Sequence, residues 1–356
     1  SRIPRGDRYS DLEISPDGRF IVCVRERHFQ DREADNELVV IATDILHEPK
    51  EPKVIAQGHD FFSSPKISPF GDAIAWIAWN HPNMPWDETE LWSGTWTVDG
   101  LVEFSSKISG NSQESLVQPQ WSPTGSLFYI SDRSNWWNVY SWQGGGPVET
   151  YVEPSDFASA SWVFGVSDYT FLSNSKIAIG KSGQGVGAFI LVDNTFSEAK
   201  RLTLKYSDIS YVKGNGDLIC FVGAGPLISP EVVVLNIATA DITVLQKSNP
   251  AVIDQDFISE PFEISFDSSE NGQAHGFYYP PKNAMFSAPK NEKPPLLVKT
   301  HGGPTGSATT NLDLSIQFWT SRGFAVVDVN YRGSTGYGRE FRNLLRGKWG
   351  VYDSDD

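Results

Sequence analysis

The sequence predicts a β-propeller followed by the first part of an α/β domain, on three observations. Tight-turn signals recur before apolar runs at a nearly constant spacing along the first 250 residues. After Asn249-Pro250 the pattern changes to an apolar run, a helical stretch and a second apolar run. The segment His301-Gly302-Gly303-Pro304 directly follows the first of these runs. A chain of 356 residues has room for two domains, which we place at 1–250 and 251–356.

The repeat consists of a turn followed by a strand-like run. In each strong copy a Ser-Pro pair precedes a glycine by two or three residues, and Gly18, Gly71 and Gly125 are 53 and 54 residues apart. Proline presets φ, an Asp or Asn caps the turn, and glycine takes the positive φ. The strong copies are Ile14–Gly18, Ile67–Gly71 and Trp121–Gly125, and weaker copies lie at Leu172–Lys176 and Lys213–Asp217.

Short β-rich runs keep the same rhythm. Two or more strands per ~40–54 residues, with turn signals between them, are typical of propeller blades. Five blade equivalents are visible before residue 250, and we expect the propeller to be incomplete at its start. The alternative is a β-sandwich with chance similarity of its turns, which the regular spacing disfavours. The runs are Leu38–Ile41, Leu91-Trp92, Val139-Tyr140, Phe189–Leu191 and Val232–Leu235.

The last hundred residues predict a different architecture. Phe262–Phe266 and Ala274–Tyr279 form a hairpin pattern, and Leu296–Thr300 and Phe324–Asn330 form apolar β-runs. A helical stretch near Leu312–Arg322 separates these two runs and ends at Gly323. Strand, helix and strand in this order predict a parallel sheet with both faces covered.

Composition excludes several classes of function. The formal net charge is −15, which disfavours nucleic acid and anionic membrane surfaces as partners. No apolar run approaches the ~18 residues of a membrane span. Cys23 and Cys220 give no disulfide framework and suit a reducing compartment, so we expect a cytoplasmic protein. Six scattered histidines and two separate cysteines make no metal site, and we expect no metal and no cofactor.

The segment from His301 to Pro304 carries the chemistry. Many α/β-hydrolases build half of an oxyanion hole from a strand that ends in this way. Paired glycines allow a sharp turn and leave a backbone N–H to face a developing negative charge. We therefore expect the N–H of Gly303 to be an oxyanion donor, with His301, Gly302 and Pro304 shaping the loop. The alternative for Gly303 is a simple turn that ends the strand, and for His301 a structural role is favoured over a catalytic one.

The order of these motifs resembles the prolyl oligopeptidase family of serine peptidases, in its acylaminoacyl-peptidase and dipeptidyl-peptidase-like branch. The resemblance implies a propeller that gates the access of short peptides or acyl-peptides to an α/β-hydrolase domain. It also implies that Gly303 and the N–H after the nucleophile share the oxyanion. The segments that carry the resemblance are Leu296–Pro304, Trp319–Ser334, Gly347–Asp353, Ser131–Ser134 and Trp79–Asp87.

The catalytic triad is not found in this sequence. In the family the nucleophile sits in a Gly-x-Ser-x-Gly elbow, and both Gly165–Tyr169 and Gly333–Gly336 fail that pattern. His301 is the only histidine at or after the motif, so no general base is available. We therefore expect a fragment that is truncated before the catalytic serine and is inactive alone, with the elbow in the next ~100 residues of the parent protein. The strand order that the resemblance implies would leave Leu296–Thr300 as an unpaired apolar edge in such a fragment.

Three further residues are candidates for substrate contact. Tyr331 and Arg332 either touch the substrate or anchor the Gly-rich loop 333–338, and Trp86 either faces a central cavity or packs between blades. We expect Trp136-Trp137 to belong to the propeller core; the alternative is a binding platform. We expect Glu33 to lie in a solvated loop; the alternative is contact with a peptide N-terminus.

Two other functions stay open at this point. One is a non-catalytic propeller interaction module with a vestigial hydrolase domain, and the other is a periplasmic propeller accessory protein, which His-Gly-Gly-Pro disfavours. The sequence leaves exopeptidase, endopeptidase and esterase activity open, and homo-oligomerisation as well.

Overall fold

The computed structural model describes residues 6–44, 51–173, 176–182, 187–193, 195–249, 253–289, 291–303 and 305–356. Its contacts divide the chain into two compact units, 1–153 with 160–166, and 154–159 with 167–356. The division predicted at residue 250 is a different one. It stays a prediction, because residues 250–252 lie outside the described part of the chain.

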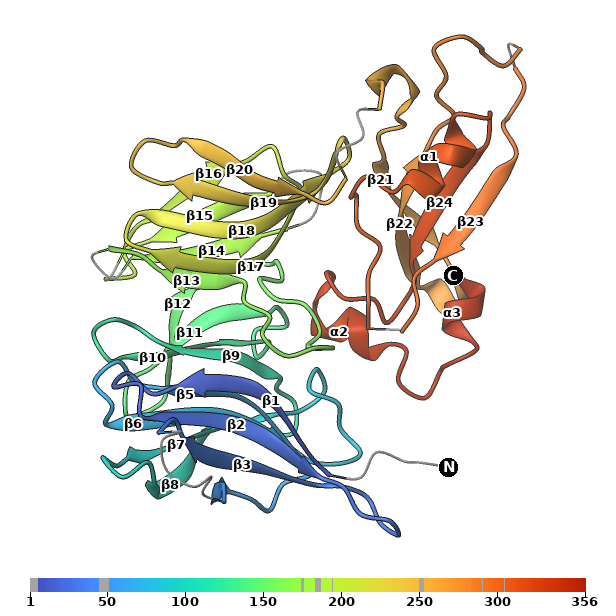
Figure 1. Cartoon of the computed structure of the whole chain (residues 1–356). Helices are drawn as coiled ribbons and strands as arrows, with labels where there is room; N and C mark the ends of the chain where they lie inside the picture. The colour runs from blue at the N-terminus through green and yellow to red at the C-terminus, as the bar shows by residue number, and fades with distance from the viewer. Residues whose placement is uncertain are drawn as a thin grey trace. The chain divides into compact units, whose positions relative to one another are not determined.

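The first unit contains three four-stranded antiparallel sheets, in each of which neighbouring strands follow one another along the chain (Figure 1). The sheets are β1 (Asp7–Ile14), β2 (Phe20–Arg27), β3 (Asp35–Ala42) and β4 (Lys53–Ala56); β5 (Phe61–Ile67), β6 (Ala73–Trp79), β7 (Glu90–Trp96) and β8 (Val102–Ser109); β9 (Leu116–Trp121), β10 (Leu127–Ser131), β11 (Asn138–Trp142) and β12 (Pro147–Tyr151).

The second unit contains two more sheets of the same kind. Across both units, all five predicted β-runs lie in strands. The strands are β13 (Tyr169–Phe171), β14 (Ile177–Lys181), β15 (Ala188–Val192) and β16 (Ala199–Thr203); β17 (Asp208–Asn215), β18 (Leu218–Gly225), β19 (Ile228–Asn236) and β20 (Ile242–Lys247).

The predicted turns stand before second strands, as expected. Gly18, Gly71, Gly125 and Gly216 have φ of 72°, 67°, 83° and 62°, which is the left-handed region that favours glycine. In the first turn Gly18 N donates to Ser15 O at 2.8 Å. The weaker copy at 172–176 includes residues 174 and 175, which lie outside the described residues.

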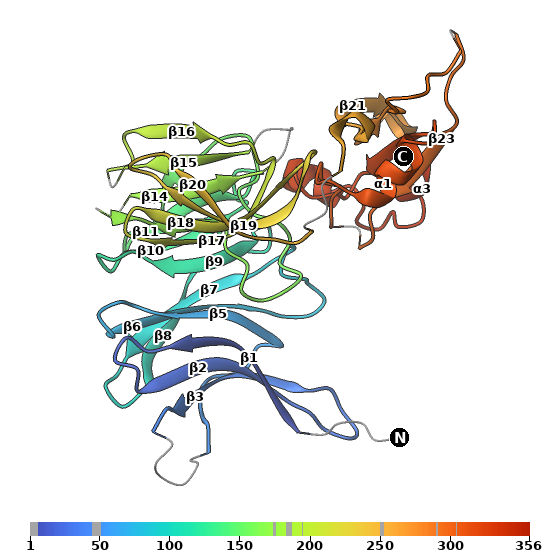
Figure 2. The ribbon, with the colours of Figure 1, turned by 45° about the horizontal axis from the view of Figure 1, so that its top comes forward.

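Inner strands such as β6, β10 and β14 are buried on both faces, which explains their continuous apolar runs. In β6, Ile74 and Trp76 pack with Val24 and Phe62, whereas Ala75 and Ile77 pack with Leu116 and Tyr129. First strands of successive sheets lie side by side, β1 with β5 and β5 with β9 in the first unit, and β13 with β17 in the second (Figure 2).

A β-bulge recurs in these first strands. Asp11, Ser64, Gln118 and Tyr211 have φ of 55°, 53°, 54° and 55°, and the pairing with the second strand shifts register there. A bulge bends its strand and releases backbone groups from the ladder.

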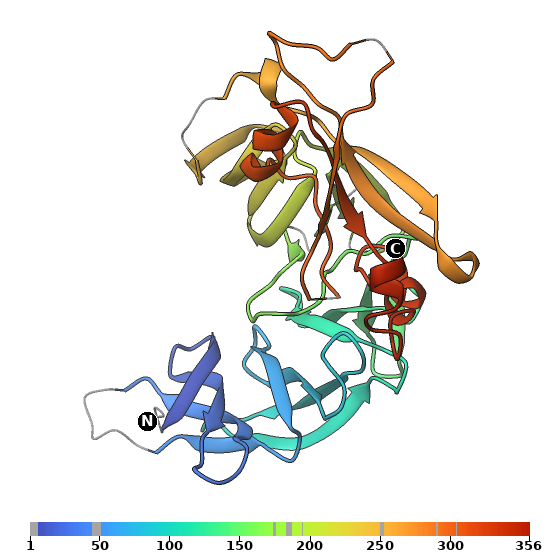
Figure 3. The ribbon, with the colours of Figure 1, turned by 90° about the vertical axis from the view of Figure 1, so that its right-hand side faces the viewer.

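The sixth sheet is mixed, in the order β21-β22-β24-β23 (Figures 1 and 3). The predicted hairpin is β21 with β22, and β23 runs parallel to β24 as predicted. The elements are 3-10 turns at Gln255–Phe257 and Ser269–Asn271, β21 (Phe262–Asp267), β22 (Gln273–Tyr279), β23 (Leu296–Thr300), α1 (Leu314–Thr320), β24 (Ala325–Asn330), α2 (Gly338–Asn343) and α3 (Tyr352–Asp355).

The two faces of this sheet are covered unequally. Ile316 of α1 packs on one face with Val326, and Tyr352 of α3 packs on the other with Val329. Burial on both faces holds for β24, whereas Leu296 and Val298 of β23 are 54% and 66% exposed. This confirms the apolar edge expected at Leu296–Thr300. In the described residues β23 is the edge strand, and its one partner is β24.

No helix in the described part of the chain is long and apolar enough to cross a membrane.

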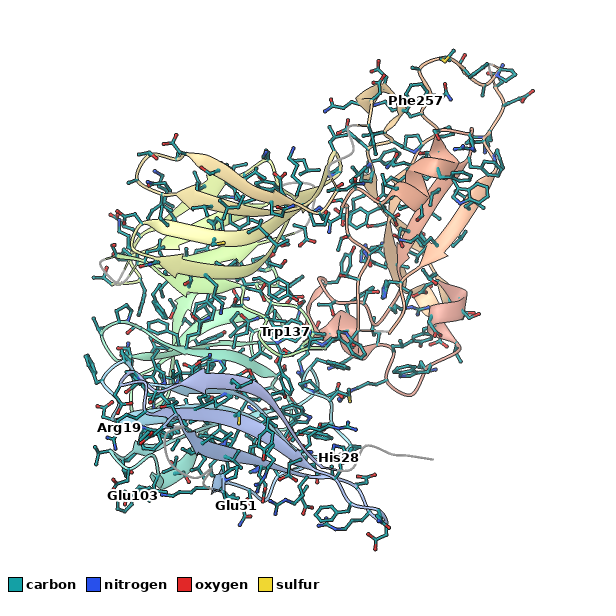
Figure 4. All side chains as sticks on the ribbon, viewed as in Figure 1. Arg19, His28, Glu51, Glu103, Trp137 and Phe257 are labelled. Carbon is teal, nitrogen blue, oxygen red and sulfur yellow. The ribbon has the colours of Figure 1, made fainter. Side chains whose placement is uncertain are left out.

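Trp137, labelled in Figure 4, lies directly before β11 and is fully buried, as expected for a core residue.

Candidate oxyanion site

The loop after β23 is the candidate site. Thr300 is the last residue of β23 and pairs with Val329, so the loop leaves the sheet where β24 also ends. Gly302 and Gly303 are exposed, and Gly303 has φ of 53°. Pro304 lies outside the described residues. The structure therefore places an exposed, left-handed glycine at the carboxyl end of a parallel strand.

His301 is held inside this loop. Its ring stacks on Tyr331 with centroids 4.5 Å apart, and its Nε2 lies 2.8 Å from Ser334 Oγ. Its Nδ1 lies 3.2 Å from the carbonyl oxygen of Gly302. Burial lowers the pKa of His301 and favours the neutral ring. The geometry suits the structural role predicted for His301, which stays a prediction.

The far end of the loop is tied to the segment after β24. Gly306 N donates to Gly303 O at 2.8 Å, and Thr335 N donates to Gly306 O at 2.9 Å. Ala308 N donates to Asn330 Oδ1 at 2.7 Å. These bonds fix the path of the loop before any ligand arrives.

The Gly-rich loop 333–338 has its own anchor. Asp156 Oδ2 accepts from Gly336 N at 3.1 Å and from Gly338 N at 3.4 Å. Gly333 has φ of 109°, and a Cβ built on it would lie 2.7 Å from Leu345 Cβ. A side chain at position 333 would therefore disturb this loop.

Arg332 is engaged within the fold. Its Nε and Nη2 donate to Asp356 Oδ1 at 2.9 and 2.6 Å, and Nη2 also donates to Ser269 Oγ at 2.9 Å. The guanidinium carbon lies 3.7 Å from the ring centroid of Tyr352. Its side chain is 3% exposed. These contacts favour the anchoring alternative over substrate contact.

Tyr331 is likewise buried, at 6% exposed, and its hydroxyl donates to His301 O at 3.2 Å. Its contact with substrate stays a prediction. Trp86 belongs to the first unit, where it lines a pocket, and its contact with substrate also stays a prediction. The Glu33 side chain is 92% exposed, as a solvated loop residue would be.

Sequence reasoning missed a charged cluster beside the loop. Lys299 Nζ lies 2.6 Å from Asp328 Oδ2 and 3.4 Å from Asp313 Oδ2. Burial raises the pKa of Asp328 despite the lysine. With His301, these residues line a pocket of about 380 Å³. The signal was present, because opposite charges stand near the ends of two apolar runs predicted to be parallel neighbours.

Comparison with known proteins shows which family the chain resembles. The model of the prolyl oligopeptidase family matches residues 310–356, which include α1, β24 and the Gly-rich loop. Over 99% of its length the chain is similar to a puromycin-hydrolyzing peptidase of Mycobacterium tuberculosis, with a TM-score of 0.93 and 33% identity. The chain is therefore similar at residues 310–356 to the prolyl oligopeptidase family, and over nearly its whole length to a solved peptidase.

Two further relatives are similar to the chain. A puromycin hydrolase structure matches all of the chain with a TM-score of 0.91 and 31% identity. The acylamino-acid-releasing enzyme of Sus scrofa is 40% identical over 70 residues, which are 20% of this chain and 10% of that enzyme. The chain spans 55% of each of the two solved structures. Both combine a propeller with a hydrolase domain, and this chain likewise consists mostly of antiparallel four-stranded sheets.

Proposed function

We propose that this chain is part of a serine peptidase that hydrolyses short peptides or acyl-peptides by acyl transfer. In this proposal the five antiparallel sheets are propeller blades, and they restrict the access of peptides to the active site. The mixed sheet is the beginning of the α/β-hydrolase domain. The peptidases among its relatives support the reaction class. The chain spans about half of the solved relatives, so the activity is proposed for the whole protein.

One observation carries the proposal. Gly303 is exposed and left-handed at the carboxyl end of β23, in a loop already fixed by hydrogen bonds on both sides. A donor fixed in advance costs no reorganisation when charge develops on the substrate oxygen. Gly303 N–H therefore acts as one oxyanion donor, and a neutral His301 holds the loop.

The remaining groups of the reaction are assigned to the rest of the protein. A serine hydroxyl attacks the carbonyl carbon while a histidine removes its proton, and the tetrahedral oxyanion rests partly on Gly303. The amine then leaves with that proton, and water hydrolyses the acyl-enzyme. We expect the serine in a Gly-x-Ser-x-Gly elbow within the ~100 residues after position 356. Lack of that elbow would favour the non-catalytic interaction module.

The decisive experiment removes one backbone N–H from the complete protein. A proline at 303 is unsuitable, because proline fixes φ near −65° and Gly303 has φ of 53°. Replacing the amide nitrogen of Gly303 by an ester oxygen removes the donor and keeps the conformation. Loss of one oxyanion donor should lower kcat by about 10²–10³, equivalent to about 2.7–4 kcal/mol.

The matched control is the same ester at Gly302, which is exposed in the same loop. Its kcat should stay within a few-fold of the unmodified enzyme. An unchanged kcat in a folded Gly303 ester would remove Gly303 from the mechanism, and an equal loss at both positions would indicate general damage to the loop.

A further inference from the structure

The first unit contains an aromatic pocket of about 440 Å³ that the proposed reaction does not use. Its lining comes from strands and loops far apart in sequence, and all of it belongs to that unit. The segments are the end of β2, the start of β3, the start of β5, the end of β6, the loop 84–86, the first half of β9 and the segment 161–166.

Four rings form the walls as two pairs. Phe61 stacks on Trp79 with centroids 5.2 Å apart and an interplanar angle of 21°. Trp86 and Trp162 lie 4.3 Å apart at 44°. Trp162 is 52% exposed although Trp86 is buried, so a wide aromatic face stays in water. Covering such a face gains about 25 cal/mol per Å².

The turn at residues 84–87, part of which lines the pocket, is held by hydrogen bonds before any ligand binds. Met84 N donates to Asp87 Oδ2 at 3.0 Å, and Asp87 N donates to Met84 O at 2.8 Å. Ser115 Oγ donates to Pro85 O at 2.7 Å, which ties this turn to the start of β9. A preformed pocket loses little free energy to reorganisation on binding.

The polar lining contains one charged group. Glu26 is the one charged residue among the lining residues; its side chain is 45% exposed, and its Oε2 lies 3.0 Å from His28 Nε2. Ser64 and Gln118, the bulge residues of β5 and β9, also line the pocket. A ligand carboxylate near Glu26 would be repelled, whereas a neutral amide would not.

We propose that this pocket binds the aromatic side chain of a peptide or acylated amino acid and disfavours one with a neighbouring free carboxylate. Its volume is at the small end of the roughly 300–1,000 Å³ of ligand pockets, which suits one ring and the adjoining backbone. That the ring belongs to a peptide substrate rests on the proposed function; the binding itself does not.

The test is saturation-transfer NMR on the 356-residue chain with N-acetyl-L-phenylalaninamide as the probe. Its ring protons should be saturated most, and N-acetyl-L-alaninamide should give no comparable signal. Trp162→Ala should weaken binding about 2- to 12-fold, the equivalent of one aromatic pair. Phe164→Ala, which changes another half-exposed lining residue, provides a second variant if the first fails to fold.

Trp349→Ala is the matched control, because Trp349 is 63% exposed and lies in the second unit. Its affinity for the probe should be unchanged. Equal losses in the Trp162 and Trp349 variants, or equal binding of the alanine and phenylalanine amides, would overturn the proposal.

A second comparison tests the charge preference. N-acetyl-L-phenylalanine should bind about two- to five-fold more weakly than its amide at low ionic strength, and Glu26→Gln should narrow that gap. A gap that Glu26→Gln leaves unchanged would refute the role of Glu26. Because no hydrolysis is measured, failure here leaves the role of Gly303 intact.

Discussion

Replacing Arg332 by methionine should open the mixed sheet. The guanidinium joins two separate parts of the second unit: it bonds to Asp356 and stacks on Tyr352 at α3, and it bonds to Ser269 in the turn before β22. The Arg332 and Asp356 side chains are 3% and 0% exposed. Methionine fills much of the same space but leaves the carboxylate of Asp356 without its cation.

Removal of one partner from a buried ion pair costs about 3–5 kcal/mol, most of it from the charge left behind. Burial of Asp356 works to raise its pKa, but hydrogen bonds from Arg332 and Ser268 hold it below the ordinary 3.8. A lowered carboxyl pKa stabilises the fold at pH above the unfolded value and loses that contribution as pH falls through the folded one. The effect of Arg332→Met should therefore be full at pH 7 and shrink below pH 4.

Hydrogen exchange by mass spectrometry reports the opening free energy of peptides that cover β24 and α3. At pH 7 we expect this opening free energy to fall by about 3–5 kcal/mol. If the opening free energy of the unmodified chain is smaller than that, it should fall to zero. The control is Arg322→Met, whose exposed guanidinium lies over Phe318, with an expected change within about 0.5 kcal/mol. The double variant Arg332→Met/Asp356→Leu should recover much of the loss. A folded Arg332→Met protein that changes no more than the control would refute this reasoning.

Two other expectations concern the loop and its strand. Leu296–Thr300 should exchange faster than Phe20–Val24 in a monomeric sample, because β23 is an exposed edge and β2 is a central strand, and equal protection would contradict this. Burial lowers the pKa of His301 below 6.5 in the folded loop, so His301 takes up a proton at a higher pH when the loop is unfolded. The folded loop should therefore lose stability as pH drops from 7 to 5. His301→Gln should abolish that part of the pH dependence in the exchange of residues 301–308, and an unchanged dependence would show that another group titrates.

Local signals made most of the fold predictable. A Ser-Pro pair with a following glycine determines a turn within a few residues, so Gly18, Gly71 and Gly125 could be placed from sequence alone. The turn at Gly71 also predicts a strand after it, and β6 begins there, with neighbours packed on both of its faces.

Features that depend on distant partners could not be predicted. The bulge residues Asp11 and Tyr211 have positive φ but no local signal for it, since such residues favour this region only weakly. Arg332 was a substrate candidate because its partner Asp356 lies 24 residues away.

The anchor of the Gly-rich loop has a consequence for synthesis on the ribosome. Asp156 and Gly336 are separated by 180 residues, so the carboxylate leaves the ribosome long before its partner amides exist. At about 5–20 residues per second, the interval is roughly 10–35 s. The three sheets of the first unit precede Asp156 in the chain and have that time to form. Slower translation of residues 160–330 would lengthen the interval before the amides of Gly336 and Gly338 are synthesised and can bind Asp156.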